Sequence, residues 1–193
     1  SESIFEDYAL NDIVIQKSIS QNLASYISDF NQGQKFILCF PSNLSLYVPD
    51  IISDFKNHNY DIGQLEINDG EKFKSLDYIQ HLAHSLMDLN CKRDTVLVAL
   101  GGGTVGDIVG FLSSIFMRGI KYINVPTTLL AMVDSSIGGK TGVNYKGVKN
   151  VLGAFHQPQL VCIDPLFLKS LDEKQMHSGI GEIIKYGLIS DSK

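Results

Sequence analysis

A glycine-rich loop follows the most apolar segment of the chain. Residues 95–100 (TVLVAL) have the composition of a buried parallel strand. Gly101, Gly103 and Gly106 come next with the spacing GxGxxG, and a helix is predicted over 108–117. Glycines permit tight turning and let backbone N–H groups approach a pyrophosphate, whose charge a helix start favours by about 0.3–1 kcal/mol. The loop predicts a dinucleotide site, although the motif alone suits equally a turn that only packs a helix on a strand.

The surroundings of this loop differ from those of an ordinary dinucleotide fingerprint. That fingerprint has an acidic residue about 20 residues after the glycines, where it holds the ribose. Here the next predicted strand ends in Pro126-Thr127-Thr128. The loop also lies near the middle of the chain rather than after its first strand. We therefore expect a dinucleotide binder of a different layout.

A second polar segment follows Pro126. About 30 residues here are dense in Gly, Ser, Thr, Lys and Asp, and a loop region of this length inside a domain is usually functional. Asp134, Lys140 and Lys149 lie in it, and two cations near one site suit an anionic, phosphorylated substrate. Lys146, in the stretch NYKG, is interpreted as a solvated loop residue.

Alternating apolar periods predict the elements that position these residues. Strands are expected over 13–16, 35–40, 64–67, 95–100, 122–125 and 161–163, and helices over 19–30, 47–58, 76–86 and 108–117. This order indicates an α/β fold, a Rossmann-like, mostly parallel sheet flanked by helices. Two helical stretches, 172–178 and 179–190, would begin an incomplete all-α second domain. We expect an α/β domain over 1–165 and the start of a truncated helical domain over 166–193.

Composition narrows the class of protein. The formal net charge is −5 and no run of Lys or Arg exceeds two residues, which argues against a nucleic-acid partner. No apolar run approaches the ~20 residues that span a bilayer, and the acidic N-terminus is not a signal peptide. The three cysteines have no CxxC pairing and are expected to be structural thiols. A cytoplasmic protein is predicted.

Several motifs together resemble the 3-dehydroquinate synthases, members of the sugar-phosphate cyclases. The motifs are GGGTVGD (101–107), MRG (117–119), VPTTLLAMVDSSIGGKTGVN (125–144), KN (149–150), GAFHQP (153–158) and GEIIKYG (181–187), with DGEKFK (69–74) similar to the family's adenosine-side motif. The resemblance runs from about residue 60 to the end. The glycine loop is shared with iron-type alcohol and glycerol dehydrogenases, whereas the segments 133–144 and 153–158 are specific to the cyclases.

The resemblance implies a set of ligand contacts. NAD would be bound by Asp69, Gly70, Glu71, Lys72, Phe73, Lys74, Gly103, Thr104, Val105, Gly106, Asp107, Thr127, Thr128, Lys140, Lys149, Phe167, Leu168, Lys169 and Ser170. The catalytic and substrate-binding residues would be Asp134, Lys140, Asn150, Lys185 and Arg118, the last reaching into the site of a second subunit in a homodimer. Glu182 would be one of three ligands of a divalent metal, zinc or cobalt.

The implied reaction converts 3-deoxy-arabino-heptulosonate 7-phosphate, a phosphorylated seven-carbon sugar acid, into 3-dehydroquinate and phosphate in the shikimate pathway. NAD would oxidise a ring hydroxyl, phosphate would leave by elimination, and the ketone would be reduced again before ring opening and aldol closure. The enzyme is therefore a phosphate-eliminating carbon–oxygen lyase with no net redox change. A metal would polarise the hydroxyl and the transient ketone.

The sequence departs from the family in two places. The family's other metal ligands are histidines downstream of the glutamate, and the five histidines here do not replace them; His81 and His84 are interpreted as solvated helix residues. One carboxylate does not hold zinc, so we expect the chain to bind NAD but to be inactive alone. Phe40 stands where the family tends to carry a small polar residue beside the adenosine. The alternatives are an NAD-dependent glycerol or alcohol dehydrogenase, another sugar-phosphate cyclase, and a bare NAD-binding module.

Overall fold

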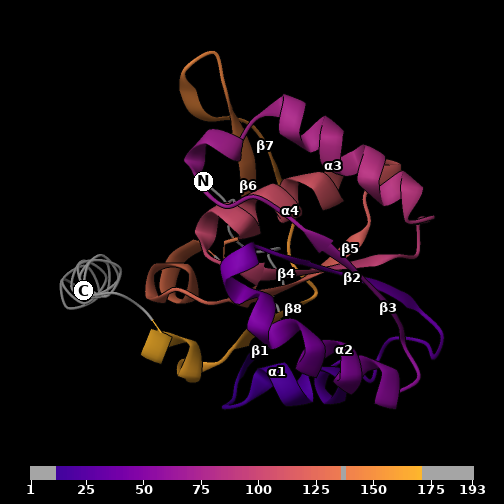
Figure 1. Ribbon diagram of the computed structural model, residues 1–193. Coiled ribbons are helices and arrows are strands. Elements are labelled where there is room, and N and C mark those ends of the chain that lie inside the picture. Colours follow the sequence, from indigo (N-terminus) through magenta and orange to yellow (C-terminus); the bar gives the residue numbers. More distant parts are fainter. Residues whose placement is uncertain (1–11, 136–137, 171–193) are drawn as a thin grey trace, which may run out of the picture.

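Six apolar segments pair side by side into one parallel sheet with helices on both faces (Figure 1). The computed structural model describes residues 12–135 and 138–170. The strands are β1 (Asp12–Ile15), β2 (Lys35–Phe40), β3 (Asp61–Glu66), β4 (Val96–Gly101), β5 (Lys121–Pro126) and β8 (Leu160–Ile163), in the spatial order β1-β8-β5-β4-β2-β3. All five pairings are parallel. The predicted Rossmann-like α/β fold is confirmed for the described residues.

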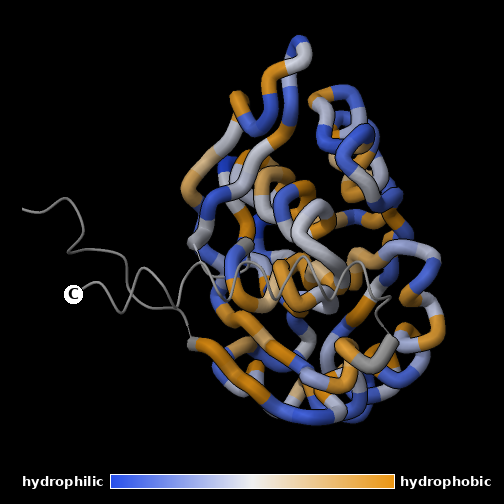
Figure 2. The backbone as a smooth tube through the Cα atoms, turned by 90° about the vertical axis from the view of Figure 1, so that its left-hand side faces the viewer, coloured by the Kyte–Doolittle hydropathy of each residue, from blue (hydrophilic) through white to orange (hydrophobic). Residues whose placement is uncertain are grey.

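Two hydrophobic clusters, one on each face of the sheet, hold the layers together. Alternate residues of a strand point to opposite faces, so Phe36 and Leu38 of β2 join one cluster while Ile37 and Cys39 join the other. The first cluster packs against α1 (Ile19–Asn22) and α2 (Val48–Asn57), and the second against α3 (Leu76–Asp88) and α4 (Gly103–Ile115). Figure 2 shows hydrophobic and hydrophilic stretches alternating along the backbone.

Some predicted boundaries were wrong. The helix expected over 19–30 is split into α1 and the 3-10 helix η1 (Leu23–Tyr26). The buried Asp54 carboxylate explains the break, because it accepts the Ala24 N–H at 2.7 Å. The strand expected over 64–67 begins at Asp61, and the helix expected from 108 begins at Gly103. The remaining short turns are η2 (Ser42–Tyr47), η3 (Glu71–Phe73), η4 (Phe116–Arg118), the π-helical turn η5 (Ala131–Ser135) and η6 (Pro165–Ser170).

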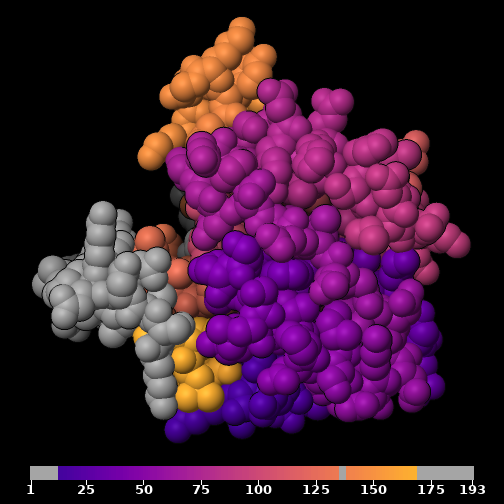
Figure 3. Space-filling model, in the orientation of Figure 1, coloured from indigo at the N-terminus to yellow at the C-terminus, as the bar shows by residue number. Residues whose placement is uncertain are grey.

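The segment after Pro126 was predicted as one long loop, and this was wrong. It contains an antiparallel hairpin of β6 (Lys140–Tyr145) and β7 (Val148–Phe155). The hairpin packs on α4, where Val143 is fully buried and Gly110 gives room for the Thr141 side chain. Its tip projects at the top of the molecule in Figure 3. The functional segment is therefore held by regular backbone pairing.

Three further expectations concern the cysteines, membrane spans and the C-terminal helices. The thiols of Cys39, Cys91 and Cys162 are free and buried, as expected for structural cysteines, and burial raises the pKa of Cys162 to about 12. Within the described residues, no helix is long and apolar enough to cross a membrane. The helices expected over 172–178 and 179–190 lie outside the described residues, and the domain boundary near Pro165 stays a prediction.

Asp164, at the end of β8, joins three elements. Its carboxylate accepts the backbone N–H of Ile19, the first residue of α1, and the N–H of Leu166 in η6, both at 2.9 Å. The residue is 2% exposed. The first N–H groups of a helix have no partner within the helix, so this carboxylate supplies what a local cap would otherwise supply.

Replacing Asp164 with alanine is expected to lower the free energy of unfolding by about 2–4 kcal/mol, because one buried and one partly buried N–H group lose their acceptor. Urea denaturation followed by circular dichroism measures the loss. Asp164→Asn keeps one acceptor oxygen and should lose roughly half as much. A loss below about 1 kcal/mol for alanine would show that water replaces the carboxylate.

Candidate functional site

Several of the residues predicted to bind a cofactor follow the carboxyl ends of strands in the sheet. Parallel strands end at the same edge, and the glycine loop follows β4, Thr127 and Thr128 follow β5, and η6 follows β8. The chain leaves β2 toward β3 but leaves β4 toward β5, in the opposite direction. Open α/β sheets bind ligands outside the carboxyl ends of their strands at such a reversal. The fold therefore offers a ligand crevice beside the glycine loop.

The glycines of this loop provide space rather than unusual torsion angles. None of Gly101–Gly106 is among the described residues with positive φ, which corrects the expectation of a glycine-dependent tight turn. A Cβ on Gly101 would lie 2.6 Å from the Val105 Cβ, and one on Gly102 would lie 3.2 Å from Thr128 Cγ2. The Thr127 N–H also donates to the Gly101 carbonyl at 2.9 Å. Side chains at these positions would fill a closely packed cradle.

This cradle fits a pyrophosphate. Helix α4 begins at Gly103, and its N-cap residue Gly102 brings no side chain to the first-turn N–H groups. The positive end of a helix of 13 residues thus faces the crevice with small residues around it. The backbone N–H groups of Gly103, Thr104 and Val105 are therefore available to an anionic group.

Gly101→Ala is expected to lower the free energy of unfolding by about 1–3 kcal/mol, because its methyl group would overlap the buried Val105 side chain. The first turn of α4 must shift to relieve the overlap, so NAD affinity should also fall, by about tenfold. Thermal melts with and without NAD measure both effects. Gly147→Ala, at the hairpin turn, is the control for NAD affinity; an equal loss there would contradict the cradle.

Lys74 connects three segments of the site. Its ammonium donates to the Asp107 carboxylate at 2.7 Å and to the side-chain oxygen of Asn150 at 2.5 Å. Lys74 is 4% exposed, so this ion pair lies largely out of water. The carbonyl of Lys74 accepts the N–H of Asn144, whose side chain donates to Glu71 at 2.9 Å. The segment 69–74, the first turn of α4 and the hairpin are thereby fastened together.

The electrostatics of Asp107 follow from its position. Burial raises the pKa of the Asp107 carboxyl above its ordinary value, while the hydrogen bond and charge of Lys74 act in the opposite direction. The charges of Glu71 and Asp134 raise the pKa further. Asp107 thus lies within the electrostatic influence of two further carboxylates, and the Lys74 ammonium is the cation in contact with it.

A cavity of about 590 Å³ adjoins this ion pair. The predicted substrate residues Asp134, Lys140 and Asn150 line it together with Asp107. Its lining includes Gly138, Gly142 and Gly153, which contribute no side chains. Val151 and Phe155 contribute apolar side chains. Residues predicted separately as cofactor and substrate contacts therefore meet in one cavity. Lys149 is exposed on β7 and is not among the residues that line it.

Other predicted residues lie elsewhere. Phe167 is buried against Tyr47, with ring centroids 4.9 Å apart, and Leu168 is partly buried in the same cluster. The backbone of Lys169 and Ser170 belongs to η6. Phe40 is also buried in this cluster, so its side chain belongs to the core. Glu182 and Lys185 lie outside the described residues.

The described residues contain no group of three His, Cys, Asp or Glu side chains that would hold a metal ion. His81 and His84 are exposed on α3, as expected for solvated helix residues. The described part of the chain therefore does not fit a catalytic zinc site, which needs three protein ligands.

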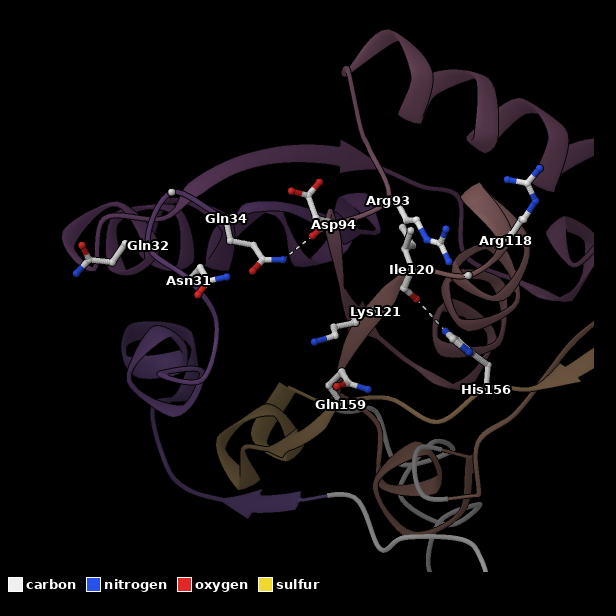
Figure 4. Close-up of a pocket in the computed structure, with 12 residues that line it drawn as sticks. Asn31, Gln32, Gln34, Arg93, Asp94, Arg118, Ile120, Lys121, His156 and Gln159 are labelled. Carbon is white, nitrogen blue, oxygen red and sulfur yellow. Dashed lines mark hydrogen bonds between the residues drawn. The ribbon is translucent and has the colours of Figure 1, made fainter.

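Arg118 lies at the other end of the sheet. It precedes β5, whereas Thr127 follows β5, and six strand residues span about 20 Å. Arg118 lines a second cavity of about 710 Å³ with Arg93, Lys121 and His156 (Figure 4). Its φ is 68°, and Met117 before it has φ 50°. Arg118 is exposed at this left-handed bend and does not line the cavity that Lys140 lines.

Two contributors to the site were missed from the sequence. Asn144 joins Glu71 and the Asn150 N–H, and Asp164 caps α1. Asn144 begins the stretch NYKG, where Lys146 was interpreted as a solvated loop residue, and nothing in the local sequence indicates the partners of Asn144. Asp164 directly follows an apolar strand. An acidic residue at such a position indicates a specific hydrogen-bonding role, so this contact could have been suspected from the sequence.

The chain matches a known protein family over more than half of its length. Residues 64–178 match the family described as 3-dehydroquinate synthase N-terminal. A 3-dehydroquinate synthase from Clostridium tetani is 45% identical over 163 residues, which make up 84% of this chain and 43% of that protein.

Two solved structures share the fold. The 2-epi-5-epi-valiolone synthase of Streptomyces hygroscopicus subsp. jinggangensis, with NAD+ and Zn2+ bound, has a TM-score of 0.82 at 30% identity over 96% of this chain and 51% of that one. A 2-deoxy-scyllo-inosose synthase complexed with carbaglucose-6-phosphate, NAD+ and Co2+ has a TM-score of 0.81 at 28% identity over 90% and 48%. The chain spans about half the length of the relatives it matches.

Proposed function

We propose that this chain, which belongs to the 3-dehydroquinate synthase family, is the NAD-binding part of an enzyme that converts 3-deoxy-arabino-heptulosonate 7-phosphate into 3-dehydroquinate and phosphate. The observation that carries the proposal is the cavity in which Asp134, Lys140 and Asn150 lie beside Asp107 of the glycine loop. A substrate there would contact the hairpin on one side and the dinucleotide loop on the other.

The cofactor would lie along the carboxyl edge of the sheet. The N–H groups at the start of α4 would hold the pyrophosphate, the segment 69–74 the adenosine side, and Thr127, Thr128, Lys149 and the backbone of η6 the remainder. Two solved relatives of similar fold contain NAD+, which supports this assignment. Bound NAD would supply reversible hydride transfer, so that a ring hydroxyl is oxidised and restored without net redox change.

The cavity residues would bind and orient the sugar acid. Lys140 would attract the anionic groups of the substrate, and the Asp134 carboxylate would accept hydrogen bonds from ring hydroxyls. Asn150, already bonded to Lys74, would present its amide N–H₂ to the substrate. Precise orientation of this kind accounts for a large part of enzymatic rate enhancement.

The rest of the active site would come from other parts of the protein. Glu182 and Lys185 are proposed as a metal ligand and a substrate contact, with further metal ligands supplied beyond this chain. Arg118 would act in the site of a second subunit of a homodimer, which its position at the opposite end of β5 supports. We place the reaction in the cytoplasm, and we expect this chain alone to bind NAD without turnover.

The experiment is phosphate release by the full-length protein with NAD, zinc or cobalt, and the seven-carbon substrate. Phosphate should accumulate while NADH does not. Steady accumulation of NADH from glycerol or simple alcohols would instead identify a dehydrogenase. Phosphate release from a different sugar phosphate alone would identify a sister cyclase. Calorimetry of this chain with NAD tests the cofactor separately, and no heat at millimolar NAD would remove that part of the proposal.

A further inference from the structure

Lys74 has an unusual position for a lysine of a nucleotide-binding segment. Its side chain is buried, and its ammonium makes two short hydrogen bonds within the protein, to Asp107 and to Asn150. A lysine that reached out to a nucleotide phosphate would instead present its charge to the crevice. Here the charge is neutralised by a carboxylate 2.7 Å away.

The two partners of Lys74 belong to the two halves of the proposed site. Asp107 is in the first turns of α4, where the pyrophosphate would lie, and Asn150 is on β7, in the wall of the substrate cavity. Asn150 also adopts φ 52°, a conformation that asparagine tolerates better than most residues. The Lys74 contact holds that residue at a bend of the hairpin.

Backbone contacts reinforce the same connection. The Asn144 N–H donates to the Lys74 carbonyl at 2.8 Å, and the Asn150 N–H donates to the Asn144 side chain at 2.9 Å. Lys74 therefore meets both strands of the hairpin, β6 through its carbonyl and β7 through its ammonium. The ion pair from Lys35 to Asp61, by comparison, measures 3.9 Å, and its side chains are more exposed.

We infer that Lys74 is a positioning residue that fixes the substrate hairpin (residues 140–155) relative to the dinucleotide loop, through Asn150 and Asp107. The identification of the ligands as NAD and a sugar phosphate rests on the proposed function, whereas the contacts of Lys74 with Asp107 and Asn150 do not. Loss of the ammonium would leave Asp107 unpaired and release Asn150, so both binding halves would lose their relative placement.

Amide hydrogen exchange tests the connection without any enzyme activity. In Lys74→Met, exchange of residues 140–155 should rise at least about tenfold, while β2 and β4 keep wild-type protection. Lys56→Met, an exposed lysine on α2, is the matched control and should change neither region. Unchanged exchange in the hairpin of Lys74→Met would overturn the inference, and so would an equal rise throughout the sheet.

Kinetics of the full-length protein test whether the effect passes through Asn150. Lys74→Met should raise KM for the sugar phosphate by about tenfold, but by less than about twofold when Asn150 is already alanine, because coupled residues are not additive. Additive effects, or a rise confined to KM for NAD, would overturn the inference and make Lys74 a nucleotide ligand. If the wild-type protein releases no phosphate, the proposed function fails, and hydrogen exchange still decides the role of Lys74.

Discussion

Replacing Lys140 with alanine in the full-length protein is expected to reduce kcat/KM for phosphate release by at least about 100-fold. Among the described residues that line the substrate cavity, Lys140 is the cation, and Asp107 and Asp134 are the carboxylates. Without the Lys140 ammonium, none of these residues would offer a cation to an anionic sugar phosphate, because the nearby Lys74 ammonium is already paired with Asp107. Steady-state phosphate release measures the effect.

The hairpin offers a matched control for Lys140. Lys146 stands at the turn of the same hairpin, exposed and next to the Tyr145 ring, and it does not line the cavity. Lys146→Ala should retain activity within about twofold, since exposed charges contribute little. Stability should be preserved in both variants, because Lys140 is exposed. Activity of Lys140→Ala close to wild type would reject the assigned role.

Arg118→Ala should inactivate the full-length protein to a similar degree, although Arg118 lines a different cavity from Lys140. The physical reason is that a guanidinium exposed on a left-handed bend would complete a neighbouring subunit's cavity, where it binds anionic groups in two places. Activity assays of the purified variant give the first measurement.

Mixing the two inactive variants gives the decisive measurement. After dissociation and reassociation, half of the dimers should be mixed, and each mixed dimer should contain one site with both Lys140 and Arg118. About a quarter of wild-type activity should therefore return. An active Arg118→Ala variant would remove the residue from catalysis. Two inactive variants that do not complement each other would place Arg118 in its own subunit's site.

The parallel sheet could be predicted because a strand that is buried on both faces is a nearly continuous run of apolar residues. Residues 35–40 and 95–100 are apolar almost throughout, and both form strands at those positions. The edge strand β3 was misplaced, since its exposed residues alternate with buried ones and its polar start at Asp61 gives little signal. Short edge strands depend on pairing more than on local pattern.

The hairpin could not be predicted from its composition. Glycines 142 and 153 and several polar residues lie within its strands, and these residues are rare in strands generally. They are present because the two backbones and α4 approach one another closely: a Cβ on Gly142 would lie 3.0 Å from the Leu152 carbonyl oxygen. Tertiary contact overrides local preference here.

That Asp134, Lys140 and Asn150 share a site was implied by the family resemblance, and they line one cavity, whereas the contacts of Lys74 were not anticipated. Its partners are 33 and 76 residues away in the chain. Spacing along a sequence carries no information about an ion pair of that range. The burial of Phe167 could not be predicted either, because an aromatic residue after a strand can belong to the core or to a ligand-binding surface.

The pairing of β1 with β8 has a consequence for synthesis of the chain. Asp12 lies opposite Leu160, about 150 residues later in the chain. The N–H of Ile19 at the start of α1 likewise lacks its acceptor until Asp164 has been synthesised. At ribosomal rates, β1 would leave the ribosome on the order of ten seconds before its only sheet neighbour among the described strands. The first strand made is thus one of the last to be paired. Chaperone demand should fall on this segment, whose Ile13 and Ile15 remain exposed even in the finished fold.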